Sequence, residues 1–160
     1  MEGVLMKSVK GFTLIELMVT VAVLAIALAI AVPSFAELIR SNRADSQREA
    51  LVTALSLARS EAVKRGATVV VEPLSGTSWN GGWQVEVGSE VLRRFPALDG
   101  ATLSGPGTGV QFNSRGQLQG VAMGSKVDMQ YRVGANYCRY ERDISINAIG
   151  RVSVTKRTCS

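Results

Sequence analysis

Glu16 stands out among the residues that could do chemistry, because it lies at the head of a long uncharged segment. Residues 17–36, LMVTVAVLAIALAIAVPSFA, carry no charge, and about 20 apolar residues are enough for a helix to cross a bilayer. A carboxylate in such a helix costs about 2.5–3.5 kcal/mol at mid-depth and less near an end. We therefore expect Glu16 to have a partner that offsets this cost.

A partner exists if the mature chain begins at Phe12. Glu16 would then lie in the first helical turn, where the helix dipole favours negative charge, and the amine of Phe12 would carry the opposite charge. Two such helices packed side by side could pair the amine of one with the carboxylate of the other, and a low dielectric strengthens that attraction. The position of Glu16 thus predicts a contact that sets the axial register between neighbouring chains.

The two cysteines, Cys138 and Cys159, are too far apart in the sequence for a CxxC motif or a four-ligand zinc site. A disulfide between them is the natural pairing. It would contribute about 3 kcal/mol in an oxidising compartment. Two buried free thiols are the alternative, because free cysteine often packs as a small hydrophobic residue.

Enzyme chemistry has little support in the sequence. Histidine is absent, which removes the commonest general base and the commonest zinc ligand. No G-x-S-x-G, Walker A or dinucleotide-binding glycine motif occurs. Ser125 and Lys126 are adjacent, but neighbours on a strand point to opposite faces. We expect no enzymatic activity, no cofactor and no metal site.

One long helix must carry the N-terminal residues. Residues 12–36 are predicted to form a membrane-spanning helix, in which Pro33 removes a backbone donor and is expected to kink or loosen the helix. Residues 37–66 are predicted to continue it as an amphipathic helix that ends at the basic pair before Gly66. Its apolar stripe is expected to pack against the following domain and consists of Leu51, Ala54, Leu55, Ala58 and Ala62.

The remainder, residues 67–160, has the period of two that is typical of strands. Loops are expected at Ser78–Trp83 and at Gly105–Gly109, both rich in turn-forming residues. We predict an α+β fold in which antiparallel sheets pack on the helix or on each other. The predicted strands are TVVVE, WQVEV, EVLRRF, VDMQYRV, DISIN and RVSVT.

The chain is basic, with a formal net charge of +5 and a pI of about 9.6. Residues 132–160 hold six basic residues against two acidic ones. Contacts from Arg151, Lys156 and Arg157 to phosphates could give salt-sensitive, sequence-independent binding of DNA. The alternative is a solvated basic rim without a ligand.

The segment Gly11-Phe12-Thr13-Leu14-Ile15-Glu16-Leu17, followed by the apolar segment with Pro33, resembles the class III signal of type IV pilins and type II secretion pseudopilins. The resemblance implies that residues 1–11 are a leader, that a prepilin peptidase cuts after Gly11, that Phe12 becomes N-methylated and that Glu16 guides subunit docking. It also implies the type IV pilin fold.

Two further segments, 110–116 (VQFNSRG) and 149–154 (IGRVSV), resemble strand-turn elements of the GspH/FimT/FimU-type minor pilins and pseudopilins. The FimT-type branch of that group includes DNA-binding pilins with a C-terminal Gly-Arg-x-Arg signature. Gly150 and Arg151 match the signature, whereas Ser153 occupies the position of its second arginine.

These resemblances imply a structural function. We expect a minor pilin that primes or joins assembly of a type IV pilus. The alternatives are a GspH-like pseudopilin of a type II secretion system and a FimT-like DNA-binding pilin for natural transformation. The implied partners are other pilins, the prepilin peptidase and the inner-membrane assembly platform. The implied location is the bacterial inner membrane, crossed once, with residues 67–160 in the periplasm.

Overall fold

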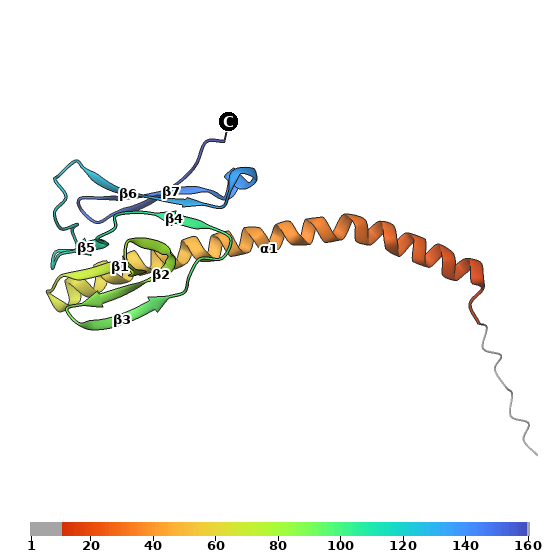
Figure 1. Cartoon of the computed structure of the whole chain (residues 1–160), viewed down its shortest axis with the longest axis horizontal. Coiled ribbons are helices and arrows are strands. Elements are labelled where there is room, and N and C mark those ends of the chain that lie inside the picture. Colours follow the sequence, from red (N-terminus) through yellow and green to blue (C-terminus); the bar gives the residue numbers. More distant parts are fainter. Residues whose placement is uncertain (1–10, 160) are drawn as a thin grey trace, which may run out of the picture. The chain divides into compact units, whose positions relative to one another are not determined.

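A long helix, α1 (Leu14–Arg65), begins the computed structural model, which describes residues 11–159 (Figure 1). The chain divides into two compact units, of which the first ends at Arg40 and the second begins at Ser41. The α+β class is confirmed, because the second unit contains two antiparallel sheets together with the C-terminal half of α1.

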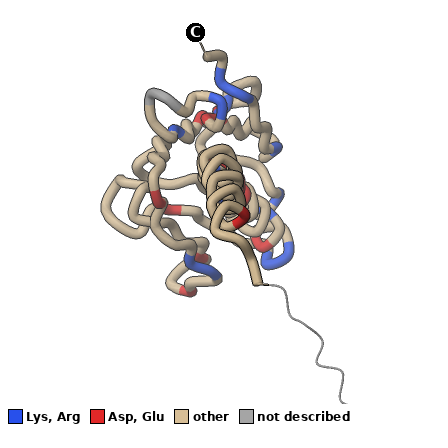
Figure 2. The backbone as a smooth tube through the Cα atoms, turned by 90° about the vertical axis from the view of Figure 1, so that its right-hand side faces the viewer, with Lys and Arg blue, Asp and Glu red and all other residues tan. Residues whose placement is uncertain are grey.

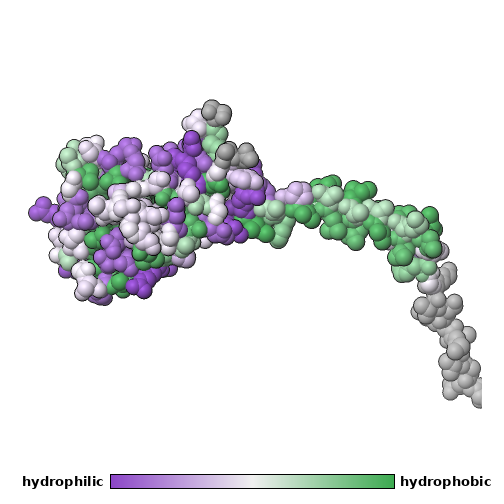
Figure 3. Space-filling view, viewed as in Figure 1, coloured by the Kyte–Doolittle hydropathy of each residue, from purple (hydrophilic) through white to green (hydrophobic). Residues whose placement is uncertain are grey.

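In the first unit α1 has no buried residue in the described part. All residues from Gly11 to Ala36 are exposed, and the helix continues through Pro33. Figure 3 shows this part of the helix as a continuous hydrophobic surface. Among the described residues, α1 is the helix that is long and apolar enough to cross a membrane, with a mean hydropathy of 2.7 over its most apolar window.

In the second unit α1 buries the predicted stripe, namely Leu51, Ala54, Leu55, Ala58 and Ala62, together with Ala44. The helix ends where the sequence predicts. Gly66 adopts a positive φ of 65°, and the amide of Ala67 donates to the carbonyl of Ala62 at 3.2 Å. This is the glycine-capped ending that satisfies the last carbonyls of a helix.

The first sheet has the strand order β3-β2-β1-β5, with antiparallel neighbours. The second sheet has the order β4-β6-β7-β8, again antiparallel. A 3₁₀ helix, η1 (Ala135–Tyr140), connects β6 to β7. The strands of the first sheet are β1 (Val69–Ser75), β2 (Ser78–Val87), β3 (Glu90–Phe95) and β5 (Val110–Phe112). Those of the second are β4 (Thr102–Ser104), β6 (Lys126–Arg132), β7 (Arg142–Asn147) and β8 (Val152–Lys156).

One hydrophobic core joins the stripe of α1 to both sheets. Its largest side chains include Trp79 and Trp83, and Trp83 stacks on Phe95 with ring centroids 5.8 Å apart. The indole of Trp79 donates to the carbonyl of Pro106 at 3.1 Å. The two sheets and the helix therefore share one interior rather than forming separate layers.

The loop expected at Ser78–Trp83 is wrong, because this segment is the first half of β2. One of the two glycines there, Gly82, serves close packing within the sheet. Gly82 has a φ of 98°, and a β-carbon at this position would overlap the carbonyl oxygen of Phe95. The second loop prediction, Gly105–Gly109, agrees with the structure, which has no strand there.

Candidate functional site

The N-terminal head of α1 is closed by a reciprocal pair of hydrogen bonds. The amide of Glu16 donates to the hydroxyl oxygen of Thr13 at 3.2 Å, and the amide of Thr13 donates to the Glu16 carboxylate at 3.5 Å. This is the capping box of a Thr-x-x-Glu sequence, in which two otherwise unpaired amides are satisfied. Glu16 is thus placed in the first turn, where its charge also favours the helix dipole.

The residues next to the head are fully accessible. Phe12 is 82% exposed, and no described atom lies within 4 Å of the position that a β-carbon on Gly11 would take. Neither packing nor a left-handed backbone requires glycine at position 11 in this chain. Apart from Gly11, the predicted leader lies outside the described residues.

A second site is built on the turn that follows β5. The side-chain oxygen of Asn113 accepts from the amides of Arg115 and Gln117 at 2.9 and 3.1 Å. The amide of Gly116 donates to the carbonyl of Asn113 at 2.8 Å, and Gly116 has a φ of 73°. The asparagine therefore holds the turn closed, and the glycine supplies the left-handed residue that the turn requires.

The turn between β7 and β8 has the same construction. The side-chain oxygen of Asn147 accepts from the amide of Arg151 at 2.8 Å, and the amide of Gly150 donates to the carbonyl of Asn147 at 2.8 Å. Gly150 has a φ of 78°. Two Asn-x-x-Gly turns, one from each sheet, thus share one geometry.

Arg59 of α1 joins these two turns. Its Nε donates to the carbonyl of Gly116, and its Nη2 donates to the carbonyl of Ile149, both at 3.0 Å. A further backbone bond, from the amide of Leu118 to the carbonyl of Ala148 at 3.0 Å, links the turns directly. We call Arg59 with the two turns the arginine clamp. It connects the helix to both sheets.

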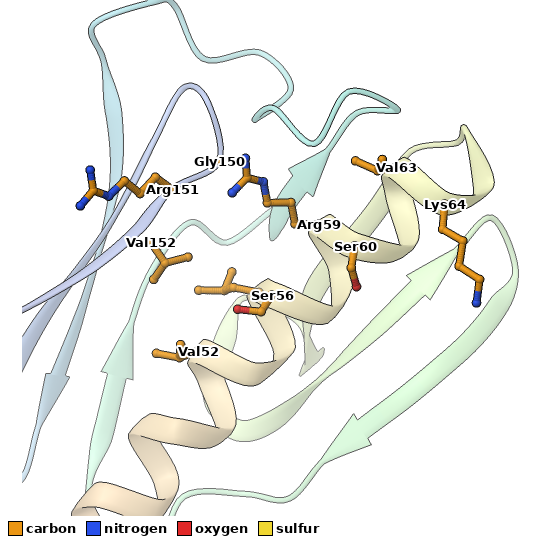
Figure 4. A pocket seen from close by; sticks show the side chains of 10 residues that line it. Val52, Ser56, Arg59, Ser60, Val63, Lys64, Gly150, Arg151 and Val152 are labelled. Atoms are coloured by element: carbon orange, nitrogen blue, oxygen red, sulfur yellow. The ribbon is translucent and has the colours of Figure 1, made fainter.

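Arg59 and the turn between β7 and β8 line an open groove of about 790 Å³. Figure 4 shows the helix side of the groove, with Val52, Ser56 and Val63 along α1, and the opposite side with Val152 at the start of β8. The side chain of Arg151 extends away from α1. The groove combines apolar and basic residues, and none of the described acidic side chains lines it.

The C-terminal basic cluster is partly engaged in ion pairs. Arg157 binds the buried carboxylate of Glu141 at 2.5 Å, and Arg132 binds Asp143 at 2.6 Å. Cys138 and Cys159 form a disulfide with their Cα atoms 5.9 Å apart, so the predicted pairing is present. The disulfide and the ion pair of Arg157 tie the segment after β8 back to η1 and to the residue that follows η1.

All three basic residues proposed for DNA binding are exposed, but only two of them are without an ion pair in the described part of the chain. Arg151 and Lys156 are exposed, and no ion pair of either side chain occurs among residues 11–159. Figure 2 shows basic segments near the C-terminus. Arg157 differs from them, because its charge is neutralised by Glu141.

Sequence reasoning missed Thr13, Arg59, Asn113 and Asn147 as site residues. The Thr-x-x-Glu spacing was a readable signal for the cap. The repeated Asn-x-x-Gly spacing was a signal for the two turns. Nothing local indicates that Arg59 meets both, since its partners lie 57 and 90 positions away in the chain.

Comparison with known families identifies two matching profiles. The family described as type II transport protein GspH matches residues 47–150. The prokaryotic N-terminal methylation motif matches residues 6–32. Among curated proteins, none matches the chain.

Two crystal structures of the type IV minor pilin FimU from Pseudomonas aeruginosa are similar to this chain. One has a TM-score of 0.61 and 22% identity, and the match covers 71% of this chain and 89% of that one. The other has a TM-score of 0.59 and 22% identity, covering 69% and 91%. At this identity the similarity shows the fold, which is that of type IV pilins.

Proposed function

Because the chain belongs to the GspH family of structural pilins and pseudopilins, we propose that it is a minor pilin that primes or joins assembly of a type IV pilus. The observation that carries the proposal is a change of environment along α1. Large apolar side chains are exposed from Leu14 to Ile39, whereas one face of the same helix is buried against the sheets from Ala44 to Ala62.

An exposed apolar surface of this size must be covered by other molecules. Exposed apolar patches larger than a few hundred Å² mark membrane or protein interfaces. In this proposal residues 12–36 lie in the inner membrane before assembly and pack against the corresponding helices of other pilins afterwards. The apolar helix thus supplies the cohesion of the filament.

Glu16 sets the register between neighbours in this proposal. Prepilin peptidase removes residues 1–11, the new amine at Phe12 is methylated, and a neighbouring amine pairs with the Glu16 carboxylate. The exposed positions of Gly11 and Phe12 support access by the processing enzymes. The capping box supports the pairing, because it holds the carboxylate at the very start of the helix.

The domain with the two sheets lies in the periplasm in this proposal. The disulfide between Cys138 and Cys159 supports this placement, since disulfides persist in oxidising compartments such as the bacterial periplasm. The assembly platform in the inner membrane would receive the helix, and the sheets would select particular neighbours.

A direct test compares processing and incorporation. Co-expression with a prepilin peptidase should shorten the chain by residues 1–11, as measured by mass spectrometry of membrane fractions. Glu16→Gln keeps a hydrogen-bond acceptor but removes the charge, so this variant should insert and be cut normally while its recovery in sheared filaments falls. Thr20→Ala, a small change one turn further along the exposed helix, is the matched control. An uncut full-length chain, or normal recovery of Glu16→Gln, would contradict the proposal.

A pseudopilin of a type II secretion system is the second candidate, and the description of the matching family favours it. The two candidates assign the same roles to the apolar helix and to Glu16. They differ in what fails when the gene is deleted. Loss of twitching motility with normal protein export assigns the chain to a pilus, and the reverse assigns it to secretion.

A further inference from the structure

β8 lies at the edge of the second sheet, where β7 is its neighbour. An edge strand presents a row of backbone donors and acceptors to any strand that can pair with it. Many natural edges are blunted by proline, bulges or inward charges. β8 reads Val-Ser-Val-Thr-Lys, pairs with β7 without a register shift and contains no proline. Its outer edge is therefore open to pairing.

The register shows which backbone groups point outward. The amide of Asn147 donates to the carbonyl of Arg151, and the amide of Arg157 donates to the carbonyl of Glu141. Hydrogen-bonded and non-hydrogen-bonded pairs alternate along an antiparallel ladder. The groups of Val152, Val154 and Lys156 consequently point away from β7, and in the described part of the chain these residues form no backbone bond outside the sheet.

The groove of Figure 4 begins at this edge. Val152 lines it together with Val52 and Val63 of α1. Val152 and Val154 share a face of the sheet with Ile146 and Ile144, their partners on β7, which are fully buried. Val154 nevertheless remains 40% exposed. A strand added beside β8 would cover Val154 and direct every second side chain toward this groove.

The charged residues near β8 indicate which side chains an added strand would direct away from the groove. Arg151 precedes β8 on the opposite face and carries a charge that is unpaired among the described residues, whereas Arg157 on that face pairs with Glu141. Lys156 ends the strand on the groove face. β8 and the lining of the groove contain no acidic residue. Opposite charges on neighbouring strands stabilise a sheet and like charges destabilise it. The outward side chains of an added strand would thus be acidic.

A second copy of this chain does not meet these requirements. If two β8 edges paired antiparallel with their Val154 residues opposite each other, Arg151 would lie opposite Arg157 and Val152 opposite Lys156. The unpaired Arg151 and Lys156 would then have no acidic side chain opposite them, because β8 contains none. The occupant must come from a different polypeptide.

We infer that β8 and the adjoining groove accept an extended segment of another protein, which adds to the second sheet as a further strand and alternates apolar with acidic side chains. Backbone hydrogen bonds supply affinity in this mode of recognition, and alternate side chains supply specificity. The inference goes beyond the proposed function and holds for either type of filament.

The test uses the full-length chain in detergent micelles and two fluorescent, end-blocked peptides, one alternating valine with glutamate and the other valine with lysine. Fluorescence anisotropy should show binding of the glutamate peptide and at least about tenfold weaker binding of the lysine peptide, a difference of about 1.4 kcal/mol. Val154→Pro removes an outward-pointing amide, which an edge strand tolerates, and should abolish binding. Val154→Thr keeps that amide and is the matched control.

A charge exchange keeps the test decisive if Val154→Pro fails to fold. The double variant Arg151→Glu, Lys156→Glu should prefer the lysine peptide, whereas Arg94→Glu on the other sheet should behave like the wild type. Equal binding of both peptides by the wild type would overturn the inference. So would a self-association that Val154→Pro abolishes, or a surface that binds duplex DNA but neither peptide.

Discussion

Gly150 lies so close to Gly116 that a β-carbon on Gly150 would overlap the carbonyl oxygen of Gly116. The Nε of Arg59 donates to that same oxygen. The two Asn-x-x-Gly turns thus meet backbone to backbone, and the arginine clamp depends on the absence of a side chain at Gly150.

Gly150→Ala should therefore destabilise the chain by more than the strain of a left-handed residue alone. We expect a loss of about 3 kcal/mol, of which about 1–2 kcal/mol is backbone strain and the rest comes from the overlap. Gly120→Ala is the matched control, because Gly120 has a φ of 73° and nothing within 4 Å of its missing β-carbon. Urea unfolding of the full-length chain in detergent measures both. Equal losses for the two variants would show that the contact with Gly116 has no energetic role.

Arg59→Ala should cost about 2–4 kcal/mol, because two charge-assisted hydrogen bonds to backbone carbonyls are lost. Arg59→Lys should recover only part of this, since an ammonium group lacks the planar fork that reaches both carbonyls. Ser60→Ala, an exposed neighbour on the same helix, is the control. Thermal unfolding followed by circular dichroism should give the highest melting temperature for Ser60→Ala, an intermediate one for Arg59→Lys and the lowest for Arg59→Ala.

Removal of the disulfide should destabilise the chain by about 3 kcal/mol in the chain-entropy model, because the cysteines are 21 positions apart. The variant Cys138→Ser, Cys159→Ser tests this by denaturant unfolding. Reductant should lower the stability of the wild type toward that of the double variant and leave the double variant unchanged. A wild type that does not respond to complete reduction would contradict the prediction.

Glu86→Gln should stabilise the chain at neutral pH. Burial, together with the nearby charge of Glu72, raises the pKa of Glu86 above its ordinary value of 4.5. At pH values between the unfolded pKa and the raised folded pKa, the folded state holds a proton that the unfolded state has lost. The free energy of unfolding therefore falls as the pH rises through the raised pKa. Glutamine stays neutral at every pH. The gain should be present at pH 7 and vanish at pH 4, as measured by urea unfolding, and an equal gain at both values would point to packing instead of charge.

Glu61→Gln should have the opposite pH dependence. The hydrogen bond from Arg65, which also binds Glu90, lowers the pKa of Glu61 below 4.5. A carboxylate with a lowered pKa contributes stability above its unfolded pKa, and this contribution disappears as the pH falls through the folded pKa. The variant should be less stable than the wild type at pH 7 and equal to it in strong acid. A loss that persists in acid would exclude the ion pair as its cause.

The sequence predicts the fold well wherever the pattern is local. The stripe from Leu51 to Ala62 follows from helical spacing, and the end of α1 follows from Gly66. The loop prediction for Ser78–Trp83 was wrong, because the glycines there indicate a loop while the two tryptophans are buried. Burial of those large side chains outweighs the turn preference of their neighbours.

The site was predictable only at the N-terminal head, where Glu16 and its apolar helix are contiguous. The arginine clamp was not predicted because its residues are distant in the sequence. Arg59 looks like a solvated residue on the polar face of a helix, and Asn113 and Asn147 look like ordinary turn residues. These residues act together only in the tertiary fold, which brings both turns within hydrogen-bond distance of the Arg59 side chain.

In the proposed filament the subunit is held by the apolar part of α1, so a pulling force passes from this helix to the domain with the two sheets. Arg59 donates hydrogen bonds to one carbonyl that follows β5 and to one that precedes β8, and these strands belong to different sheets. In this proposal tension along α1 reaches both sheets through one side chain. The arginine clamp would thus make the domain with the two sheets respond to stretching as one unit.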